Sequence, residues 1–521
     1  MGIRLRRWWA WAGIGTPVFA LMVLVVVAAV RADETAGYKP PHDRPGPAVE
    51  RIQYRAVPAA EAGQAFRAGD IDLYAFGLRP SVAVGLKGTP GTRFYEAPAT
   101  TLCLVLNPAP AKEGSLNPLS LPEVRRSLQL LVDRSFIAQD IYRGLANPMA
   151  TYVSPFDFDY LIAAEVVREQ GLRHAPDLAR ERIARAMTEA GAVLREGRWQ
   201  YQGKPVTLKF VIRTEDERRD IGDAVATTLE RSGFTVERLY RDFGPAIQTV
   251  HESDPALLEW HLYTEGWAKV AGERWDYATA NQMASPWQGN MPGWLEEGFW
   301  QYQSPTADEV GKRLYRGEFQ SLDERNALYR QLLETSLEDS IRVWLVVVMN
   351  AFPTGDQLTG VTEDIGAGPR NLWTNRAAYV PGRDILRIGN LNVWTASSIW
   401  NTVDGFSDIF SVEIWRNLSD PAVWRHPASA QPIPLRAAYQ VETAGPQGKL
   451  PVPADAFLWD AKAREFRKVG PGVQATSKVT LDFSRYFQSN WHHGQRITMA
   501  DLVFSLYQGF DMAFDLKKAE V

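Results

Sequence analysis

The chain has 521 residues, of which 45% are hydrophobic and 23% charged, with 40 glycines, 33 prolines and one cysteine. This composition excludes a disordered, collagen-like or coiled-coil chain, and the length favours roughly two to four domains or lobes. The lone Cys103 excludes an intramolecular disulfide and any metal site built from several cysteines. A formal net charge of −4 argues against nucleic acid as a partner.

The first 32 residues carry an apolar leader. No charge occurs from Trp8 to Val30, and Arg4, Arg6 and Arg7 precede that stretch. About 20 apolar residues span a bilayer, and a basic flank stays on the cytoplasmic side. The same segment fits a cleaved signal peptide. Residues 1–32 are therefore predicted to be a signal anchor or a signal peptide, and the rest of the chain is predicted to be exported. It would be anchored to the membrane and face outward if the leader is kept, and it would be periplasmic or extracellular if the leader is cleaved.

A proline- and glycine-rich linker, residues 33–47, follows the leader and cannot hold a helix. From there, apolar spacing and turn residues predict a succession of strands and helices. In chain order these are a strand at 49–56, a helix at 59–68, a strand at 70–73, helices at 122–132 and from Asp177 to Ala190, a strand at 206–212, helices at 221–229 and 321–333, and a strand at 341–349. Asp177 is predicted to cap its helix, and Ser321 with Glu324 to form a capping box.

The composition of the sequence changes near Pro381. A strand is predicted at 384–388, followed by tryptophan-rich loops and proline-rich turns up to about residue 473. Because strands and helices alternate before this point, the fold class is α/β. We place a domain boundary here, between residues 48–380 and residues 381–521.

The most specific motif lies near the end of the chain. Trp491–Ser505 reads WHHGQRITMADLVFS, with a glycine turn, Thr498 and Asp501 at a helix start, and Leu502, Val503 and Leu506 expected to face inward. This segment resembles the W-H-D-G-x-P-x-T-A-x-D-V-x-F-S motif of the bacterial extracellular solute-binding proteins of family 5, which serve peptide and nickel ABC importers.

Weaker similarities to that family cover most of residues 48–375. They lie at Val49–Arg55, Ala65–Asp72, Leu106–Asn107, Val124–Leu128, Val132–Arg134, Tyr142–Gly144, Leu229–Val236, Gly266–Trp267 and Asp323–Leu333. The order is rotated, because the opening strand and the W-H-x-G motif of the family stand last here. Residues 48–380 thus resemble the family's C-terminal part and residues 381–521 its N-terminal part. The strand at 384–388 is therefore expected to lie in the same sheet as the strand at 49–56. A circular permutation, the start of a second copy, or a chain cut short at Val521 would each produce this order.

The resemblance implies a two-lobed, periplasmic-binding-protein-like fold of type II, with mixed sheets and a hinged cleft, after one N-terminal apolar helix. It also implies an extracytoplasmic solute-binding protein that passes peptides or similar small polar solutes to the permease subunits of an ABC importer. A membrane-tethered carbohydrate-active enzyme or an oligosaccharide-binding protein is the alternative, because 18 tryptophans suit sugar stacking. The resemblance implies no enzymatic activity.

Candidate ligand-binding residues cluster around two segments. In peptide binders of the family, an acid shortly after the Gly266–Trp267 position holds the ligand's amine, but here Ala268-Lys269-Val270 follows. The candidates are Glu265, Trp267, Glu273, Trp275, Asp276 and Tyr277, with Trp394 and Trp400 on the loop where family members contact ligand. Asp276, flanked by Trp275 and Tyr277, is the best anchor for a ligand cation.

We expect no metal site and no cofactor. His492 and His493 are adjacent and have no third ligand nearby in the sequence, and the remaining histidines lack metal-binding spacing. No G-x-S-x-G elbow, phosphate-binding loop or dinucleotide fingerprint occurs.

Overall fold

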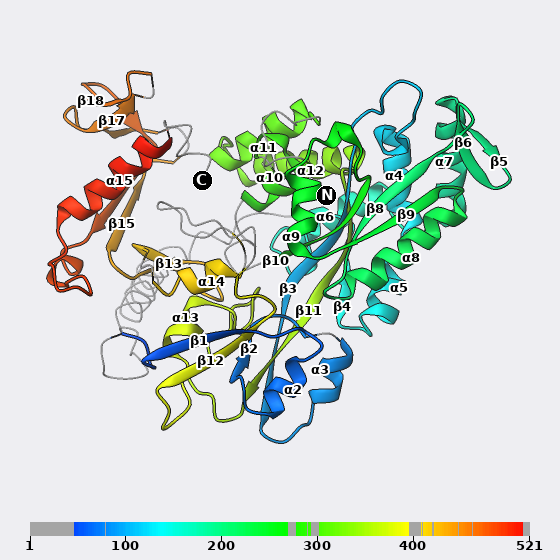
Figure 1. The fold of residues 1–521 in the computed structure, drawn as a ribbon. Helices are drawn as coiled ribbons and strands as arrows, with labels where there is room; N and C mark the ends of the chain where they lie inside the picture. The colour runs from blue at the N-terminus through cyan, green and yellow to red at the C-terminus, as the bar shows by residue number, and fades with distance from the viewer. Residues whose placement is uncertain are drawn as a thin grey trace, which may run out of the picture. The chain divides into compact units, whose positions relative to one another are not determined.

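The computed structural model describes residues 46–78, 80–268, 278–288, 290–292, 302–394, 408, 410–418, 421–445, 448–460 and 462–513 (Figure 1). The chain divides into two compact units, Met1–Ala48 and Val49–Val521, and the fold below is that of the second. The predicted leader lies outside the described residues. Among the residues that are described, no helix is both long and apolar enough to cross a bilayer.

A mixed sheet of nine strands forms the centre of the second unit. Its strands, in spatial order, are β1 (Arg51–Ala56), β12 (Ile385–Asn390), β2 (Leu73–Tyr74), β11 (Arg342–Gly355), β3 (Thr92–Leu106), β10 (Leu262–Ala268), β8 (Thr207–Arg213) and β9 (Thr235–Arg241), with β4 (Ala146–Pro148) paired to β11. The strands predicted from the sequence are all present in this sheet, with boundaries shifted by a few residues.

The sheet joins segments that are far apart in the sequence. Strand β12 pairs in parallel with β1, in register from Arg51 opposite Ile385 to Ala56 opposite Asn390, and the two lie side by side in Figure 1. This confirms that the strand after the predicted boundary shares a sheet with the first strand of the chain. The division into residues 48–380 and 381–521 itself stays a prediction.

Two long antiparallel strands, β3 and β11, run through the whole sheet and connect its two halves. We call β1, β12, β2 and the adjoining ends of the long strands the first half, and β10, β8, β9 and the opposite ends the second half. The pairing of β3 with β11 is irregular in the middle, where it steps from Thr100 opposite Val348 to Ala97 opposite Asn350. Pro98, which lacks an N–H donor, lies inside this step.

The helices of the described residues are α2 (Ala62–Arg67), α3 (Pro80–Leu86), α4 (Pro122–Leu131), α5 (Arg134–Phe136), α6 (Tyr160–Glu169), α7 (Pro176–Glu189), α8 (Arg218–Arg231), α9 (Phe243–His251), α10 (Ala278–Ala284), α11 (Pro305–Arg316), α12 (Leu322–Asp339), α13 (Leu372–Ala377), α14 (Ser411–Trp415) and α15 (Met499–Ala513). Helices pack on both faces of the sheet, whereas α15 packs against Trp459 and Phe466.

In the second half, helices on both faces explain the apolar run of β3. Leu102 and Leu104 pack into a core with α4, α7 and α8, whereas Cys103 and Val105 pack on the opposite face with α9, α10, α11 and α12. Successive strand residues point to opposite faces, so a strand buried on both sides is apolar at every position.

The first half is smaller and also has two apolar faces. Phe66 of α2 and Leu86 of α3 cover Tyr74 on one face. On the other face, Leu73 packs with Leu386 and with residues that follow β11.

The remaining strands form small sheets. They are β5 (Val193–Arg195), β6 (Arg198–Tyr201) and β7 (Lys204–Pro205) in one sheet, and the pairs β13 (Val423–Arg425) with β14 (Pro432–Pro434), β15 (Ala438–Thr443) with β20 (Ser477–Asp482), β16 (Leu450–Pro451) with β19 (Gln474–Ala475), and β17 (Phe457–Asp460) with β18 (Glu465–Lys468).

One detail of helix α15 and one of helix α7 differ from the sequence prediction, whereas the start of α15 agrees with it. Val503 and Leu506 are exposed rather than inward-facing. At the start of α15, the Asp501 carboxylate accepts hydrogen bonds from the Thr498 backbone N–H and hydroxyl, so the acid satisfies the helix start. Asp177 does not cap α7, because Pro176 already begins that helix and Asp177 lies in its first turn, paired with Arg180.

Candidate functional site

The parallel strands of the two halves end at the same place. Ala268, the last residue of β10, pairs with Thr100 of β3, which in turn pairs with Val348 of β11. From the other side, the chain leaving β2 reaches Ala351 of β11 through the Leu78 backbone N–H. The carboxyl ends of β10 and β2 therefore approach each other across the irregular middle of β3 and β11. In open α/β sheets, ligands bind outside the carboxyl ends of the strands.

Three phenylalanines from three segments meet beside these strand ends. Phe76 follows β2, Phe243 begins α9 directly after β9, and Phe410 precedes α14. The ring centroid of Phe410 lies 6.1 Å from that of Phe76 and 5.8 Å from that of Phe243. Phe410 is buried, so this segment contacts both halves of the sheet at once. Aromatic pairs at these distances attract each other beyond simple burial.

A guanidinium group adjoins this aromatic contact. Arg213, the last residue of β8, lies with its Cζ 5.0 Å from the ring centroid of Phe243. The same side chain forms a paired hydrogen bond with Glu215, at 2.9 and 2.7 Å. Because its charge is neutralised by Glu215, Arg213 serves as an oriented donor and a stacking surface rather than as a free cation.

Glu265, a predicted ligand contact, lies in a buried ionic network inside the second half. One carboxylate oxygen lies 3.1 Å from Nε of Arg342 and accepts from the Cys103 thiol at 3.4 Å. The other lies 3.2 Å from Nε2 of His251. Both oxygens are thus engaged within the protein. Glu265 organises this network, and its contact with a ligand stays a prediction.

The network sets the charge of its members. Burial by itself raises the pKa of Glu265, but the Arg342 guanidinium and His251 more than offset this and hold the pKa at about 2. Burial raises the pKa of the Cys103 thiol, and the Glu265 carboxylate raises it further. Glu265 is therefore ionised and Cys103 is a neutral thiol at neutral pH, which gives neither of them the properties of a general acid or a nucleophile.

The other predicted residues fall into two groups. Trp267 is half-buried at the end of β10, with the Arg342 guanidinium carbon 6.0 Å from its ring. Trp394 is 64% exposed and follows β12. Trp267 thus lies near the carboxyl end of β10 and Trp394 after β12, which are not adjacent strands of the sheet, and their role in binding stays a prediction. Glu273, Trp275, Asp276, Tyr277 and Trp400 lie outside the described residues.

Phe76, Phe243, Phe410 and Arg213 were not among the predicted site residues. Three of the four lie at or just after the carboxyl ends of strands β2, β8 and β9, which is a signal the sequence does contain. Their meeting, however, depends on the order of strands in the sheet.

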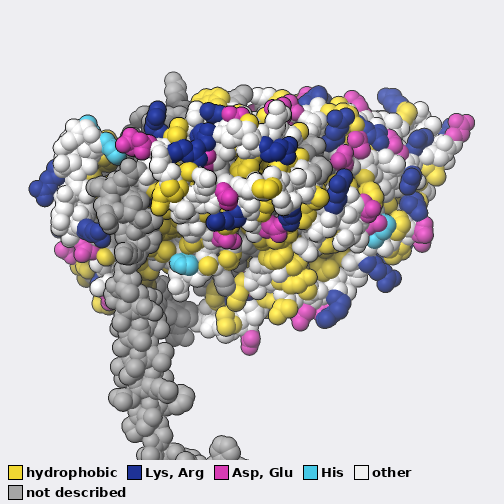
Figure 2. Space-filling model, turned by 90° about the horizontal axis from the view of Figure 1, so that it is seen from below, with side chains coloured by type: hydrophobic (Ala, Val, Ile, Leu, Met, Phe, Trp, Pro, Cys, Tyr) yellow, Lys and Arg dark blue, Asp and Glu magenta, His cyan; other side chains and the backbone are white. Residues whose placement is uncertain are grey.

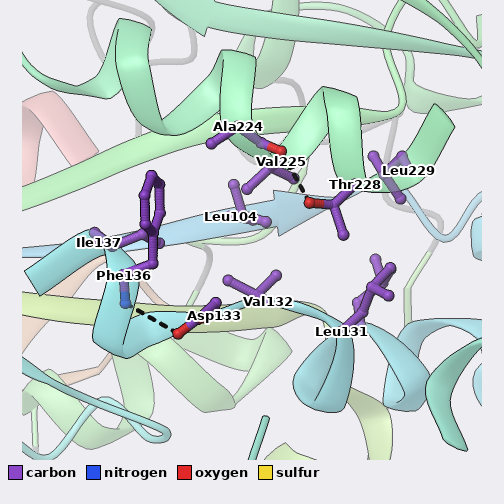
Figure 3. Close-up of a pocket in the computed structure, with 11 residues that line it drawn as sticks. Leu104, Leu131, Val132, Asp133, Phe136, Ile137, Ala224, Val225, Thr228 and Leu229 are labelled. Carbon is purple, nitrogen blue, oxygen red and sulfur yellow. Dashed lines mark hydrogen bonds between the residues drawn. The ribbon is translucent and has the colours of Figure 1, made fainter. Parts of the chain in front are cut away.

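Three cavities lined by described residues lie elsewhere. One, of about 40 Å³, lies between α8 and the α4–α5 segment and is lined by apolar side chains such as Leu104, Val132 and Val225 (Figure 3). The hydroxyl of Thr228 donates to the Ala224 carbonyl of its own helix, and the Asp133 carboxylate accepts from the Phe136 backbone N–H. With its polar groups already engaged, this cavity is a packing void. Two larger pockets, each of about 320 Å³, lie around Arg134 and around Lys209.

Neither surface charge nor metal ligands point to a further site among the described residues. On the face shown in Figure 2, basic and acidic side chains are interspersed rather than gathered by sign. Within the described part of the chain, no three histidine, cysteine, aspartate or glutamate side chains are grouped as metal ligands would be.

The chain belongs to the bacterial extracellular solute-binding proteins, family 5. The sequence profile of the middle region of that family matches residues 26–289, just over half of the chain. This agrees with the resemblance seen in the sequence motifs and makes the chain a member of a family of binding proteins. No curated protein sequence matches the chain significantly.

One solved structure with a TM-score above 0.5 supports the fold, and two others are more distantly similar. The oligopeptide ABC transporter periplasmic binding protein of Thermotoga maritima, solved with mannohexaose, has 18% identity and a TM-score of 0.51, over 63% of this chain and 62% of that one. The oligopeptide-binding protein AppA of Bacillus subtilis, solved with a nonapeptide, has 15% identity and a TM-score of 0.48, over 62% and 58%. NikZ of Campylobacter jejuni, solved with Ni(L-His), has 15% identity and a TM-score of 0.45, over 58% of this chain and 56% of that one.

The match to each structure is partial, since the chain spans about three fifths of the length of these proteins. The α/β fold with a mixed sheet is that of periplasmic binding proteins, as predicted. The family membership favours binding over catalysis and lends no support to a carbohydrate-active enzyme.

Proposed function

We propose that this protein is an extracytoplasmic solute-binding protein of an ABC importer, which binds peptides or similar small polar solutes and delivers them to the membrane permease. The observation that carries the proposal is the facing arrangement of strand ends from two halves of one sheet across the irregular middle of β3 and β11. Function then lies in the different affinities of an open and a closed state, and no covalent step is needed.

The irregular middle of the two long strands supports a hinge. The step between Val348 and Asn350, opposite Pro98, interrupts the ladder of hydrogen bonds where the halves join. A connection with fewer paired groups bends at lower free-energy cost than a regular ladder. Both halves have apolar cores of their own on either side of this step, so they can rotate as bodies.

Movement of the halves can be measured by energy transfer between dyes. The only natural cysteine, Cys103, is fully buried, so dyes can be placed on Arg67→Cys in α2 and Asp220→Cys in α8, both exposed. We expect transfer efficiency to rise when ligand co-purified with the protein, identified by mass spectrometry, is added back to stripped protein. Tight binding without any change in efficiency would contradict hinge closure.

For the ligand anchor, we propose Asp276, flanked by Trp275 and Tyr277, as the acid that meets a ligand cation. A desolvated ion pair contributes more than one at the surface, so Asp276→Asn should weaken binding at least tenfold, or about 1.4 kcal/mol, and leave the apo melting temperature nearly unchanged. The control is Glu237→Gln, an exposed acid on β9. If Asp276→Asn bound the ligand as tightly as the wild type, Glu273 or Glu265 would be the proposed acid that meets the ligand cation.

Ligand class is decided by a competition panel of a mixed peptide library, mannohexaose and nickel–histidine. We expect peptides to compete best, because an acidic anchor between aromatic residues suits an ammonium group and variable apolar side chains. Preferred binding of mannohexaose would favour an oligosaccharide binder, and its hydrolysis would favour the enzyme alternative.

Export through the N-terminal segment is part of the same proposal. The segment would hold the protein at the membrane facing outward, or would be removed to release a periplasmic or extracellular protein. We expect a chain that starts at Asp33 to stay in solution without detergent. Aggregation of that shortened chain, reversed by lipid, would contradict a soluble body behind a leader.

A further inference from the structure

The second half of the sheet contains a pocket that shares no residue with the candidate functional site. It has a volume of about 320 Å³ and lies between the segment after α4, the chain around β4, and helix α6. Apolar side chains form much of its wall, among them Met149, Val153, Ala163 and Leu172. This volume is at the lower end of the range for small-molecule sites in proteins.

The guanidinium group of Arg134 lines this pocket and is buried without a counter-ion. It donates to four neutral oxygens: Nε to the carbonyls of Met149 and Trp344, and the two Nη nitrogens to the carbonyl and side-chain oxygens of Gln129, all at 2.7 Å. Among the described residues no carboxylate lies within ion-pair distance of it. Each Nη nitrogen has two hydrogens and donates one of them to Gln129, which leaves one on each for another acceptor.

A buried cation without an anion is costly. Burial lowers the pKa of Arg134 to about 10, with no acid acting in the opposite direction. An arginine is still charged at neutral pH under these conditions. A bound anion would supply the missing charge.

The mouth of the pocket is basic as well. Arg173 and His174 line it, both exposed, and the residues that line the pocket, all described, include no aspartate or glutamate. An acid adjoins the mouth: the Asp133 carboxylate lies 3.3 Å from Nδ1 of His174 and caps α5. The lining therefore carries a net positive charge over apolar walls.

We propose that this pocket, which we name the Arg134 pocket, binds a small organic monocarboxylate with a short apolar body. The carboxylate would accept the two remaining Nη hydrogens of Arg134, and the apolar part would contact Met149, Val153 and Leu172. Guanidinium groups hold carboxylates through such paired bonds. Apolar walls favour this anion over inorganic phosphate, which has no apolar part to bury. The site is distinct from the cleft of the proposed solute-binding function and does not depend on it.

Equilibrium dialysis of the full chain with radiolabelled hexanoate tests the proposal. We expect saturable binding with a Kd below about 1 mM, and at least about tenfold weaker competition by hexanol and by phosphate. Hexanol competing as well as hexanoate would overturn the role of charge. Phosphate competing best would overturn the monocarboxylate, and no saturable binding would overturn the site.

Variants localise the binding. Ala164→Phe, at a half-buried lining position of α6, should fill the pocket and weaken hexanoate binding at least about tenfold. Arg173→Gln should weaken it about threefold, because the charge at the mouth is screened by solvent. The matched control is Arg168→Gln. Arg168 is an exposed arginine on α6, the helix that also carries Ala164, and it does not line the pocket. Wild-type affinity in Ala164→Phe, with wild-type melting temperature, would place any hexanoate elsewhere and overturn the proposal.

Discussion

The nine-stranded sheet and the C-terminal hairpins differ sharply in how they bury apolar side chains. The two largest apolar clusters among the described residues lie where helices cover β3, β11 and the strands beside them. From residue 421 to 513, the apolar side chains that are buried among those described are Ala437 and Ile497. Val441, Val479 and Leu506 are exposed there. Small aromatic groups pack within the described part of this C-terminal region: Trp459 stacks on Phe510 at 4.6 Å, and Phe483 contacts Tyr486 and Phe487.

The comparison shows that a segment can carry a specific sequence motif without burying many apolar side chains. The W-H-x-G segment is the most specific motif of the chain, and its turn is local: the Gly494 N–H donates to the Trp491 carbonyl, and Gly494 has a φ of 92°, which favours glycine. Such a turn forms from its own residues. A core needs a second layer, and two-stranded sheets provide little of one.

Breaking the Glu265 network should have the largest effect. Arg342→Met would leave a buried carboxylate without its main cation, so the free energy of unfolding should fall by about 3–5 kcal/mol. Urea denaturation followed by tryptophan fluorescence measures this. The matched control is Arg313→Met, whose pair with Glu324 is exposed and should contribute less than about 1 kcal/mol. A loss in Arg342→Met no larger than in the control would contradict the structural role of the network.

Equivalent leucine truncations in two helices test the comparison directly. Leu332 of α12 is fully buried, whereas Leu506 of α15 is 65% exposed. Leu332→Ala should cost about 2–5 kcal/mol, because it opens a cavity in the core. Leu506→Ala should change stability by less than about 0.5 kcal/mol. If Leu506→Ala were as destabilising as Leu332→Ala in thermal unfolding, α15 would be buried in solution.

Acid should weaken the sheet region through Glu265. Its folded pKa is lowered from 4.5 to about 2, so its ionised form stabilises the protein above pH 4.5. That contribution is lost as the pH falls from 4.5 toward 2, because the unfolded chain takes up the proton first. Urea midpoints measured between pH 7 and pH 2.5 should fall less steeply for Glu265→Gln than for the wild type. Parallel slopes would show that Glu265 does not titrate as described.

Helix starts should give the smallest difference. The Ser321 hydroxyl accepts from the Glu324 backbone N–H at 3.2 Å at the start of α12, as predicted from the sequence. Ser321→Ala should therefore lower global stability by about 1 kcal/mol. Asp501→Asn at the start of α15 should instead speed amide hydrogen exchange only within α15, because a thinly packed helix opens locally. Unchanged global stability in Ser321→Ala, or a loss of global stability in Asp501→Asn, would contradict these roles.

The sequence by itself determined the local elements. The 3.6-residue period of Ile221, Val225 and Leu229 marked α8, and those side chains are buried in the core. The apolar run at 341–349 marked β11, which extends to Gly355. The pairing of β12 with β1 followed from family resemblance in rotated order rather than from periodicity. Periodicity is a local signal. It is visible in the sequence because each helix or strand must bury one of its faces.

Only the tertiary structure decided which distant side chains meet. Glu265 and Arg342 are 77 positions apart, and their pairing depends on β10 and β11 lying on either side of β3. In the same way, Phe410 contacts Phe76, which follows β2, and Phe243, which follows β9, because the sheet brings these two carboxyl ends near each other. The exposure of Val503 and Leu506 likewise depends on which layer covers α15. Such contacts are set by the order of strands in the sheet and by the layers that cover it, which no local pattern encodes. The sequence therefore shows an acid close to Trp267, but it does not show that Arg342 and His251 bind that acid.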